Sequence, residues 1–217
     1  MGAAVVVYGL LTAAALLLTG LRGRSPLSLP TDEAWLAGAI PALTMRTALS
    51  LAIGLGLGAC AVRATKLLVT RTRWAMRLHV ELRAMVGPLS GARIAFFAVT
   101  SGVTEEIFFR GALQPLAGVW LTSALFGAVH VGPNRTFLPW TLWAAFMGLL
   151  FGLSYQLTGS LLGPVVAHIV VNYENLHYLV SYDPVTVARE RRITPEAPTL
   201  VGARVRTSGR STPAEPR

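Results

Sequence analysis

The sequence has little charge, and acidic residues are the scarcest part of it. Of its 217 residues only 13% are charged, with 19 lysines and arginines against 10 acids, whereas 53% are hydrophobic. A water-soluble domain seldom combines so few charges with long apolar runs. The composition therefore predicts an all-α fold, a polytopic membrane helical bundle with room for about six spans of about 20 residues each.

Cysteine and the common signatures of metal and nucleic-acid sites are also scarce or missing. Cys60 is the only cysteine, which excludes an internal disulfide and a cysteine metal cluster. The zinc-protease signature H-E-x-x-H is absent. The formal charge of +9 accompanies no nucleic-acid-binding motif, and its residues gather between and after the apolar runs. That distribution is typical of cytoplasmic loops of membrane proteins, so we expect no nucleic-acid partner.

Six apolar runs are candidates for membrane spans. Their approximate bounds are Ala3–Leu21, Ala34–Val62, Ile94–Leu113, Leu116–Val131, Leu138–Leu157 and Ser160–Val180. The first could be a signal peptide, but no basic segment precedes it and no clear A-x-A site follows it, which favours a retained helix. In the second, Pro41 and Arg46 interrupt the run. Its Gly54 and Gly58 have a spacing that permits close helix packing, or else leaves a thinly packed, flexible helix.

The connection from Arg63 to Arg93 is strongly basic, with seven lysines and arginines against the single acid Glu81. Apolar residues recur between the charges, a pattern typical of a helix lying on an anionic membrane surface, although a solvated connector is equally consistent. Basic loops face the cytoplasm, and an even number of spans returns the polar tail after Asp183 to the same side. We therefore expect both termini to be cytoplasmic and residues 181–217 to form a disordered basic tail. Arg22 and Arg24 argue weakly against this orientation, which places them outside.

Two adjacent carboxylates interrupt the third run, in the segment V-T-S-G-V-T-E-E-I-F-F-R-G-A-L from Val99 to Leu113. Ionisable side chains at membrane depth are costly unless they are paired or face a wet cavity, so they mark candidate functional sites. In a helix, Glu106 and Arg110 are i,i+4 neighbours that can form an ion pair. Glu105 then points about 100° away, at 3.6 residues per turn. We therefore assign Glu106 and Arg110 to the shape of the site and Glu105 to its chemistry.

Two later runs carry further polar residues, F-G-A-V-H ending at His130 and H-I-V-V-N from His168 to Asn172. The spacing of four places His168 and Asn172 on one helical face. Glu105 and a histidine could hold and deprotonate a water that attacks a carbonyl carbon. The His and Asn pair could donate to the resulting oxyanion. Zinc held by Glu105, His130 and His168 is an alternative, and interhelical hydrogen bonds without catalysis are another.

These residues resemble the motifs of a known family. The segments E-E-I-F-F-R, F-x-x-x-H and H-x-x-x-N, at Glu105–Arg110, Phe126–His130 and His168–Asn172, resemble in their order the three motifs of the CAAX-protease and bacteriocin-processing family. Its members are also called Abi proteins or glutamic-type intramembrane endopeptidases. The resemblance covers about Ile94–Val180. It implies a four-helix catalytic core within the membrane, and no metal or other cofactor.

The resemblance also implies roles for the individual residues. Glu105 and His130 would activate the water, and His168 with Asn172 would stabilise the oxyanion. The supporting residues would be Glu106, Arg110 and Phe126, the last of them as core packing or a wall of the cavity.

The resulting organisation has three parts. Residues 1–93 hold the first two spans and the basic connector, residues 94–180 the catalytic core, and residues 181–217 the tail. We expect a multi-pass protein of the cell membrane, bacterial by its Ala, Gly, Arg and Pro usage, that cleaves a membrane-associated protein or peptide and whose connector contacts anionic lipid. A non-catalytic immunity or scaffold protein on the same fold stays open. A transporter with a proton relay also stays open, although no internal repeat supports it.

Overall fold

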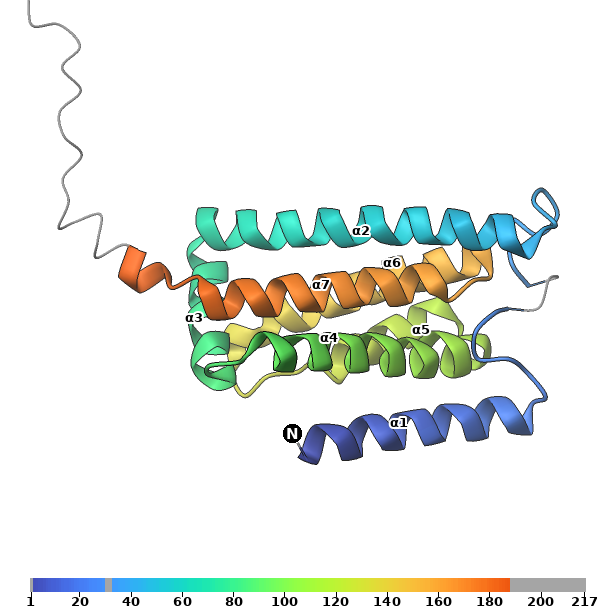
Figure 1. Ribbon diagram of the computed structural model, residues 1–217, viewed down its shortest axis with the longest axis horizontal. Helices are drawn as coiled ribbons and strands as arrows, with labels where there is room; N and C mark the ends of the chain where they lie inside the picture. Colours follow the sequence, from blue (N-terminus) through green and yellow to red (C-terminus); the bar gives the residue numbers. More distant parts are fainter. Residues whose placement is uncertain (1, 30–32, 188–217) are drawn as a thin grey trace, which may run out of the picture. The chain divides into compact units, whose positions relative to one another are not determined.

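The structure is a computed structural model that describes residues 2–29 and 33–187. The chain divides into two units, Met1–Asp183 and Pro184–Arg217, and the helices named below belong to the first. They are α1 (Gly2–Leu21), α2 (Leu43–Arg71), α3 (Arg73–Val86), α4 (Gly91–Glu106), the π-helix η1 (Ile107–Leu113), α5 (Gln114–Ala128), the 3₁₀-helix η2 (Arg135–Phe137), α6 (Leu138–Thr158) and α7 (Leu162–Ser181) (Figure 1).

The all-α prediction is confirmed for the described part of the chain, where the only β contact is an isolated bridge between Ser28 and Ser160. Three segments are long and apolar enough to cross a membrane, Ala4–Leu21, Leu43–Arg71 and Arg135–Thr158. A fourth candidate is the pair formed by α3 and the run Gly91–Ala128, which meet at 105°. The six-span prediction is consistent with these helices and stays a prediction. Most of the predicted disordered tail, from residue 188 onward, lies outside the described residues.

Helix α2 starts later and ends later than the sequence indicated. It begins at Leu43 instead of Ala34, because Pro41 disfavours a helical conformation at the residue before it. It then continues through Arg63 to Arg71. The hydroxyl of Thr72 accepts from the backbone N–H of Ala75 and so caps the start of α3. The basic connector is therefore divided between the end of α2 and a separate helix, α3.

Helices α2 and α7 pack unusually closely, which confirms the packing interpretation of the small residues in α2. A Cβ atom added to Gly54 would lie 2.2 Å from the carbonyl oxygen of Gly163, and one added to Gly163 would lie 2.1 Å from that of Ser50. The hydroxyl of Ser50 also accepts from the N–H of Gly163 at 3.1 Å and donates to the carbonyl of Ser160 at 3.0 Å. The backbones approach so closely because no side chain separates them.

The helical run Gly91–Ala128 reverses direction inside α5, at Gly118. This residue has a φ of 74°, in the region that favours glycine. Before the reversal, Gln114 donates to the carbonyl of Gly152 on α6. After it, the chain returns along the same helix, so that a Cβ on Gly127 would lie 2.6 Å from that of Ala145. The reversal brings His130, just beyond the end of α5, back toward α3 and the start of α6.

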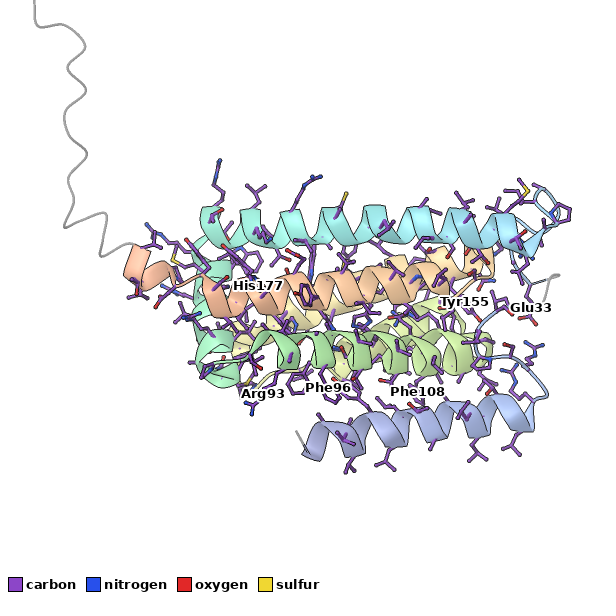
Figure 2. All side chains as sticks on the ribbon, viewed as in Figure 1. Glu33, Arg93, Phe96, Phe108, Tyr155 and His177 are labelled. Carbon is purple, nitrogen blue, oxygen red and sulfur yellow. The ribbon has the colours of Figure 1, made fainter. Side chains whose placement is uncertain are left out.

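Helix α1 packs on the side formed by α4 and η1 (Figure 1). Phe96 and Phe108 lie between these elements and α1 (Figure 2). The facing side of α1 buries Ala15 and Thr19, which are 0% and 3% exposed. The opposite side exposes large apolar residues, as expected for a helix facing lipid: Val5, Val6, Val7, Leu10, Leu16 and Leu17.

Candidate active site

The two adjacent carboxylates of the third run lie at the end of α4 and have different surroundings. Glu106 is fully buried, and its Oε1 accepts from Arg110 Nη1 at 2.9 Å and from His168 Nδ1 at 2.7 Å. Arg110 is also fully buried and donates a second hydrogen bond, at 2.9 Å, to the carbonyl of Gly148 on α6. The predicted ion pair within the helix is present, and it extends to α6 and α7. Four helical elements, α4, η1, α6 and α7, are thus joined next to the site.

The π-helix η1 begins directly after Glu106 and contains Arg110. Single π-turns inserted in α-helices occur frequently at functional sites. Here the guanidinium carbon of Arg110 lies 4.4 Å from the ring centre of Phe126, within the range of a cation–π contact. The centre of the same ring lies 4.7 Å from that of His130 and 5.8 Å from that of His168. Phe126 therefore forms a wall between the buried cation and both imidazoles.

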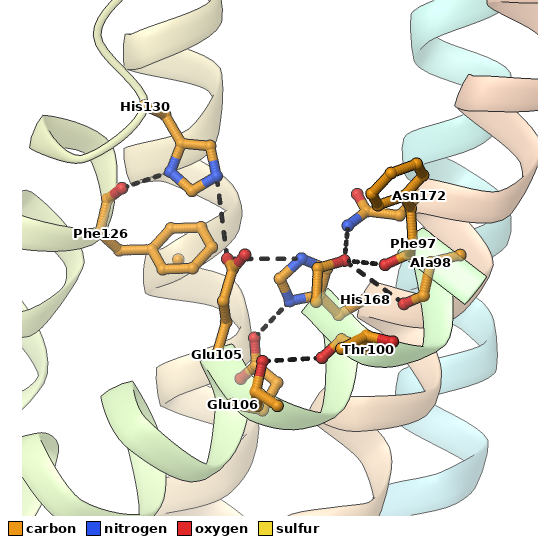
Figure 3. Close-up of polar contacts among 12 residues, drawn as sticks. Phe97, Ala98, Thr100, Glu105, Glu106, Phe126, His130, His168 and Asn172 are labelled. Atoms are coloured by element: carbon orange, nitrogen blue, oxygen red, sulfur yellow. Dashed lines mark hydrogen bonds and ion pairs between the residues drawn. The ribbon is translucent and has the colours of Figure 1, made fainter. Parts of the chain in front are cut away.

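Glu105 points away from this ion pair and lies between two histidines (Figure 3). Its Oε2 is 3.8 Å from His130 Nε2 and 3.9 Å from His168 Nε2. Within the described part of the chain, this buried Oε2 has no hydrogen-bond partner. A carboxylate from α4, an imidazole from the turn after α5 and an imidazole from α7 therefore converge on one point, as the sequence predicted for Glu105, His130 and His168.

The hydrogen bond made by the Nδ1 atom of each imidazole determines which ring nitrogen carries a proton. His130 Nδ1 is 2.7 Å from the carbonyl oxygen of Phe126, and His168 Nδ1 is 2.7 Å from the Glu106 carboxylate. Both partners only accept hydrogen bonds, so both Nδ1 atoms carry a proton. Each Nε2 is then free either to accept a proton or, in an imidazolium, to donate one. Both of these nitrogens face Glu105, an arrangement suited to acid–base chemistry.

Asn172 lies one turn after His168 on α7, at the same site (Figure 3). Its Nδ2 donates to the hydroxyl of Ser101 at 2.8 Å, and Ser101 in turn donates to the carbonyl of Phe97 at 2.7 Å. Ser101 was not among the predicted site residues. The available signal was its position one turn before Glu105 on the same helix.

These residues line a cavity of about 670 Å³. That volume is in the range of small-molecule and peptide-side-chain sites. Away from the polar cluster its walls are mainly apolar and aromatic, among them Leu78 and Leu82 of α3 and Trp140, Trp143 and Met147 of α6. The site therefore has a polar wall with the carboxylate and imidazoles, and apolar walls that suit an apolar ligand segment.

His79 of α3 lies in the same cavity but belongs to a different set of contacts. Its Nε2 is 3.0 Å from the carbonyl of Tyr182, next to the C-terminal end of α7. Burial lowers the pKa of His79 below its ordinary 6.5, and Arg83 lowers it further, while the hydrogen bond to Tyr182 and the charge of Asp183 oppose the change. His79 therefore acts here as a neutral hydrogen-bonding group that joins α3 to α7.

The zinc alternative can be compared with this geometry. The Nδ1 contacts of both histidines resemble those that orient metal-ligating imidazoles. Yet in residues 2–29 and 33–187 no group of three or more His, Cys, Asp or Glu side chains has the arrangement of a metal site.

Comparisons with known proteins match the segment that contains these residues to a known family. Residues 88–173 match the family model described as "Type II CAAX prenyl endopeptidase Rce1-like". The "Uncharacterized protein YpbD" of Bacillus subtilis (strain 168) is 35% identical over 81 residues, which cover 36% of this chain and 41% of that protein. The matched part thus spans less than half of the relative's length. No solved structure matches significantly. The resemblance of the three motifs is confirmed by this match, since the segment 88–173, with every predicted site residue in it, matches the Rce1-like model of type II CAAX prenyl endopeptidases.

Proposed function

We propose that this protein is an intramembrane endopeptidase that hydrolyses a peptide bond in a membrane-associated protein or peptide. The observation that carries the proposal is the convergence of Glu105, His130 and His168 beside a largely apolar cavity. Placing a carboxylate within the membrane costs free energy. Helix packing alone does not explain why Glu105 faces two imidazoles and forms no hydrogen bond to a described residue through its buried Oε2. The match of this segment to an endopeptidase family supports the same function.

In the proposed reaction, Glu105 and the Nε2 of His130 bind the attacking water and take its proton as the oxygen bonds to the carbonyl carbon. The tetrahedral intermediate then collapses, and the carbon–nitrogen bond breaks. The proton passes to the leaving amine, so the products are a carboxylic acid and an amine. Positioned general acid–base groups contribute about 10²- to 10⁴-fold to such reactions.

His168 and Asn172 supply the proposed oxyanion donors. Because Nδ1 of His168 already donates to Glu106, its Nε2 can donate only when the ring is an imidazolium. The amide nitrogen of Asn172 carries two hydrogens, one of which is directed to Ser101, leaving the other for the oxyanion.

The test uses the purified full-length protein in nanodiscs. The probe is an internally quenched peptide that ends in a farnesylated CAAX sequence, chosen from the family description. In parallel, new N-termini are compared in membranes from cells that express wild type or Glu105→Gln. We expect cleavage by wild type and a loss of about 10²- to 10⁴-fold in Glu105→Gln. Glu174→Gln, which removes an acid paired with Lys66 on the same bundle, is the matched control and should cleave normally.

Equal cleavage by wild type and Glu105→Gln would exclude the proposed mechanism. We further propose that no metal takes part. EDTA and 1,10-phenanthroline should then leave the rate unchanged, whereas inhibition that added zinc reverses would support the zinc alternative.

We also propose that the outward face of α3 contacts anionic lipid. Its exposed residues combine Arg73 and Arg77 with the apolar Met76 and Val80, as in interfacial helices. The inward face of the same helix lines the cavity, so lipid contact and the site share one element. Cleavage should be faster in nanodiscs with anionic lipid than in zwitterionic ones, and the double variant Arg73→Gln with Arg77→Gln should lose that difference. An unchanged difference in the variant would remove this part of the proposal.

A further inference from the structure

Helix α1 lies outside the segment that matches the family, yet it reaches the candidate site. Tyr8 is the residue of α1 that lines the cavity, together with Ser101, Glu105 and Asn172. It follows a helical spacing with the buried Ala15 and Thr19, so it points to the packed side of α1. Nothing in the three motifs assigns a role to this residue.

The position of α1 is fixed by a close backbone contact just beyond its C-terminal end. A Cβ atom on Gly111 of η1 would lie 2.2 Å from the carbonyl oxygen of Pro26. The glycine therefore lets the chain after α1 rest directly on the π-helix that contains Arg110. This contact holds the inward face of α1 in register with α4 and η1.

At the site, Tyr8 lies near Ser101 and Glu105, and all three residues line the same cavity. A serine hydroxyl has one hydrogen and two lone pairs. The hydrogen of Ser101 is directed to the carbonyl of Phe97, at 2.7 Å, and one lone pair accepts from Asn172 Nδ2, at 2.8 Å. The other lone pair is available to the Tyr8 hydroxyl as donor. The hydrogen bond from Asn172 to Ser101 thus joins α7 to α4, and Tyr8 of α1 lines the cavity at the same place.

We propose that Tyr8 and Ser101 are positioning residues that orient the side-chain amide of Asn172 at the candidate site. With its own hydrogen on Phe97, Ser101 can only accept from Asn172, and a hydrogen bond donated by Tyr8 would hold the serine hydroxyl in that orientation. The amide must then present its nitrogen, not its oxygen, to Ser101, and the second N–H is left for the reacting carbonyl. The role in catalysis rests on the proposed function, whereas the contact of α1 with Ser101 does not.

The first experiment measures kcat and KM for the farnesylated probe. Ser101→Ala should lower kcat by about 10- to 100-fold, less than the loss of about 10²- to 10³-fold typical of deleting an oxyanion donor itself. Tyr8→Phe should lower kcat by a smaller factor. KM should stay the same in both, because the orientation of Asn172 matters in the transition state and not in ground-state binding. Ser101→Thr, which keeps the hydroxyl, should restore most of the rate.

Thr12→Val is the matched control on α1. The hydroxyl of Thr12 donates to the carbonyl oxygen of Tyr8 within the same helix, so its removal should leave kcat unchanged. If Tyr8→Phe cleaves as fast as wild type while Glu105→Gln is inactive, this inference is wrong and the proposed function stands. If wild type cleaves nothing in either assay, the proposed function is what fails.

A second experiment is independent of catalysis. In a Cys60→Ser background, which removes the exposed native thiol, the pair Tyr8→Cys and Ser101→Cys is treated with a short bis-methanethiosulfonate cross-linker. An intramolecular cross-link is expected. The control pair Leu10→Cys and Ser101→Cys should not react, because Leu10 is 66% exposed on the outer side of α1. Failure of the first pair to cross-link would overturn the inference whatever the enzyme activity.

Discussion

Glu105 and Glu106 are neighbours in the sequence, but helical geometry gives them different partners. Consecutive residues point about 100° apart, so one carboxylate meets Arg110 while the other meets two imidazoles. Glu106 is fully buried and pairs with the cation of Arg110, so the stability of the fold depends strongly on its charge. Glu105 has no buried cation to neutralise, which leaves it available for proton transfer.

This contrast predicts opposite effects of the same substitution at the two positions. Glu106→Gln removes the counter-charge of a fully buried arginine and should lower the free energy of unfolding by about 3–5 kcal/mol. Glu105→Gln should leave it near the wild-type value while lowering the cleavage rate by about 10²- to 10⁴-fold. Thermal unfolding of both variants in the same detergent measures the difference. An equal loss of stability in Glu105→Gln would contradict the division of roles.

The residue-scale predictions that succeeded depended on local spacing. The Glu106–Arg110 ion pair follows from positions i and i+4, and the shared face of His168 and Asn172 follows from the helical repeat. The bond from His168 to Glu106 could not be predicted, because it depends on how α7 is placed along α4. That placement is set by packing, with Gly102 against Ile169, where an added Cβ would lie 2.7 Å from Ile169 Cγ1. Ser101 escaped prediction for the same reason.

At the scale of elements, apolar runs located the helices well, and their ends less well. The predicted runs Leu138–Leu157 and Ser160–Val180 agree closely with α6 and α7. The π-helix η1 was not predicted, because hydropathy contains no signal for a change in hydrogen-bond register. The reversal implied between the predicted runs Ile94–Leu113 and Leu116–Val131 lies slightly later, at Gly118. The extension of α2 to Arg71 was also missed, since charge marks the end of the apolar run and not the end of the helix.

The close packing of α2 on α7 predicts that two glycines of α2 respond differently to one methyl group. Gly54→Ala forces the two backbones apart and should destabilise the protein by about 1–3 kcal/mol, the usual cost of overpacking. Gly56→Ala is the matched control, because a Cβ there meets no atom within 4 Å and alanine favours the helix. Unfolding midpoints in detergent measure both. Equal midpoints would show that α2 and α7 are not held by this contact.

Helix α3 is held to α7 by two basic side chains, which gives this contact a pH dependence. Arg83 donates to the carbonyls of Leu179 and Val180, and His79 bonds the carbonyl of Tyr182. Because burial lowers the pKa of His79 below 6.5, folding favours the neutral ring. Its contribution to stability is complete above pH 6.5 and is lost as the pH falls through the lowered pKa.

The unfolding midpoint should therefore fall as the pH is lowered from 8 toward 5, and His79→Gln should reduce this dependence. His177→Gln is the control, since His177 is exposed on α7 and should leave the dependence unchanged. The midpoint is measured for all three proteins across the same buffers. If the unfolding midpoint of His79→Gln fell as steeply with decreasing pH as that of wild type, groups other than His79 would cause the pH dependence.

At the scale of the whole described bundle, basic side chains gather at one end. Arg93 and His177 lie at the end that holds α3, and Glu33 and Tyr155 lie at the other (Figure 2). The contact of α3 with the C-terminal end of α7 confirms that the basic connector and the end of α7 share one end of the bundle. At the opposite end, the N–H of Leu29 donates to the carbonyl of Gly159, joining the loop after α1 to the loop after α6. These contacts are consistent with an even number of crossings, which stays a prediction.

The positive-inside rule then predicts which end faces the cytoplasm. The α3 end carries Arg73, Arg77 and Arg83, whereas at the other end Arg24 is paired with Glu33 at 2.7 Å. In a Cys60→Ser background, Arg77→Cys should react with a membrane-impermeant maleimide only after the cells are permeabilised. Ser25→Cys, exposed in the loop after α1, should react in intact spheroplasts. The reverse labelling pattern would show that the protein has the opposite orientation in the membrane. Both positions are exposed, and they differ mainly in the end of the bundle at which they lie.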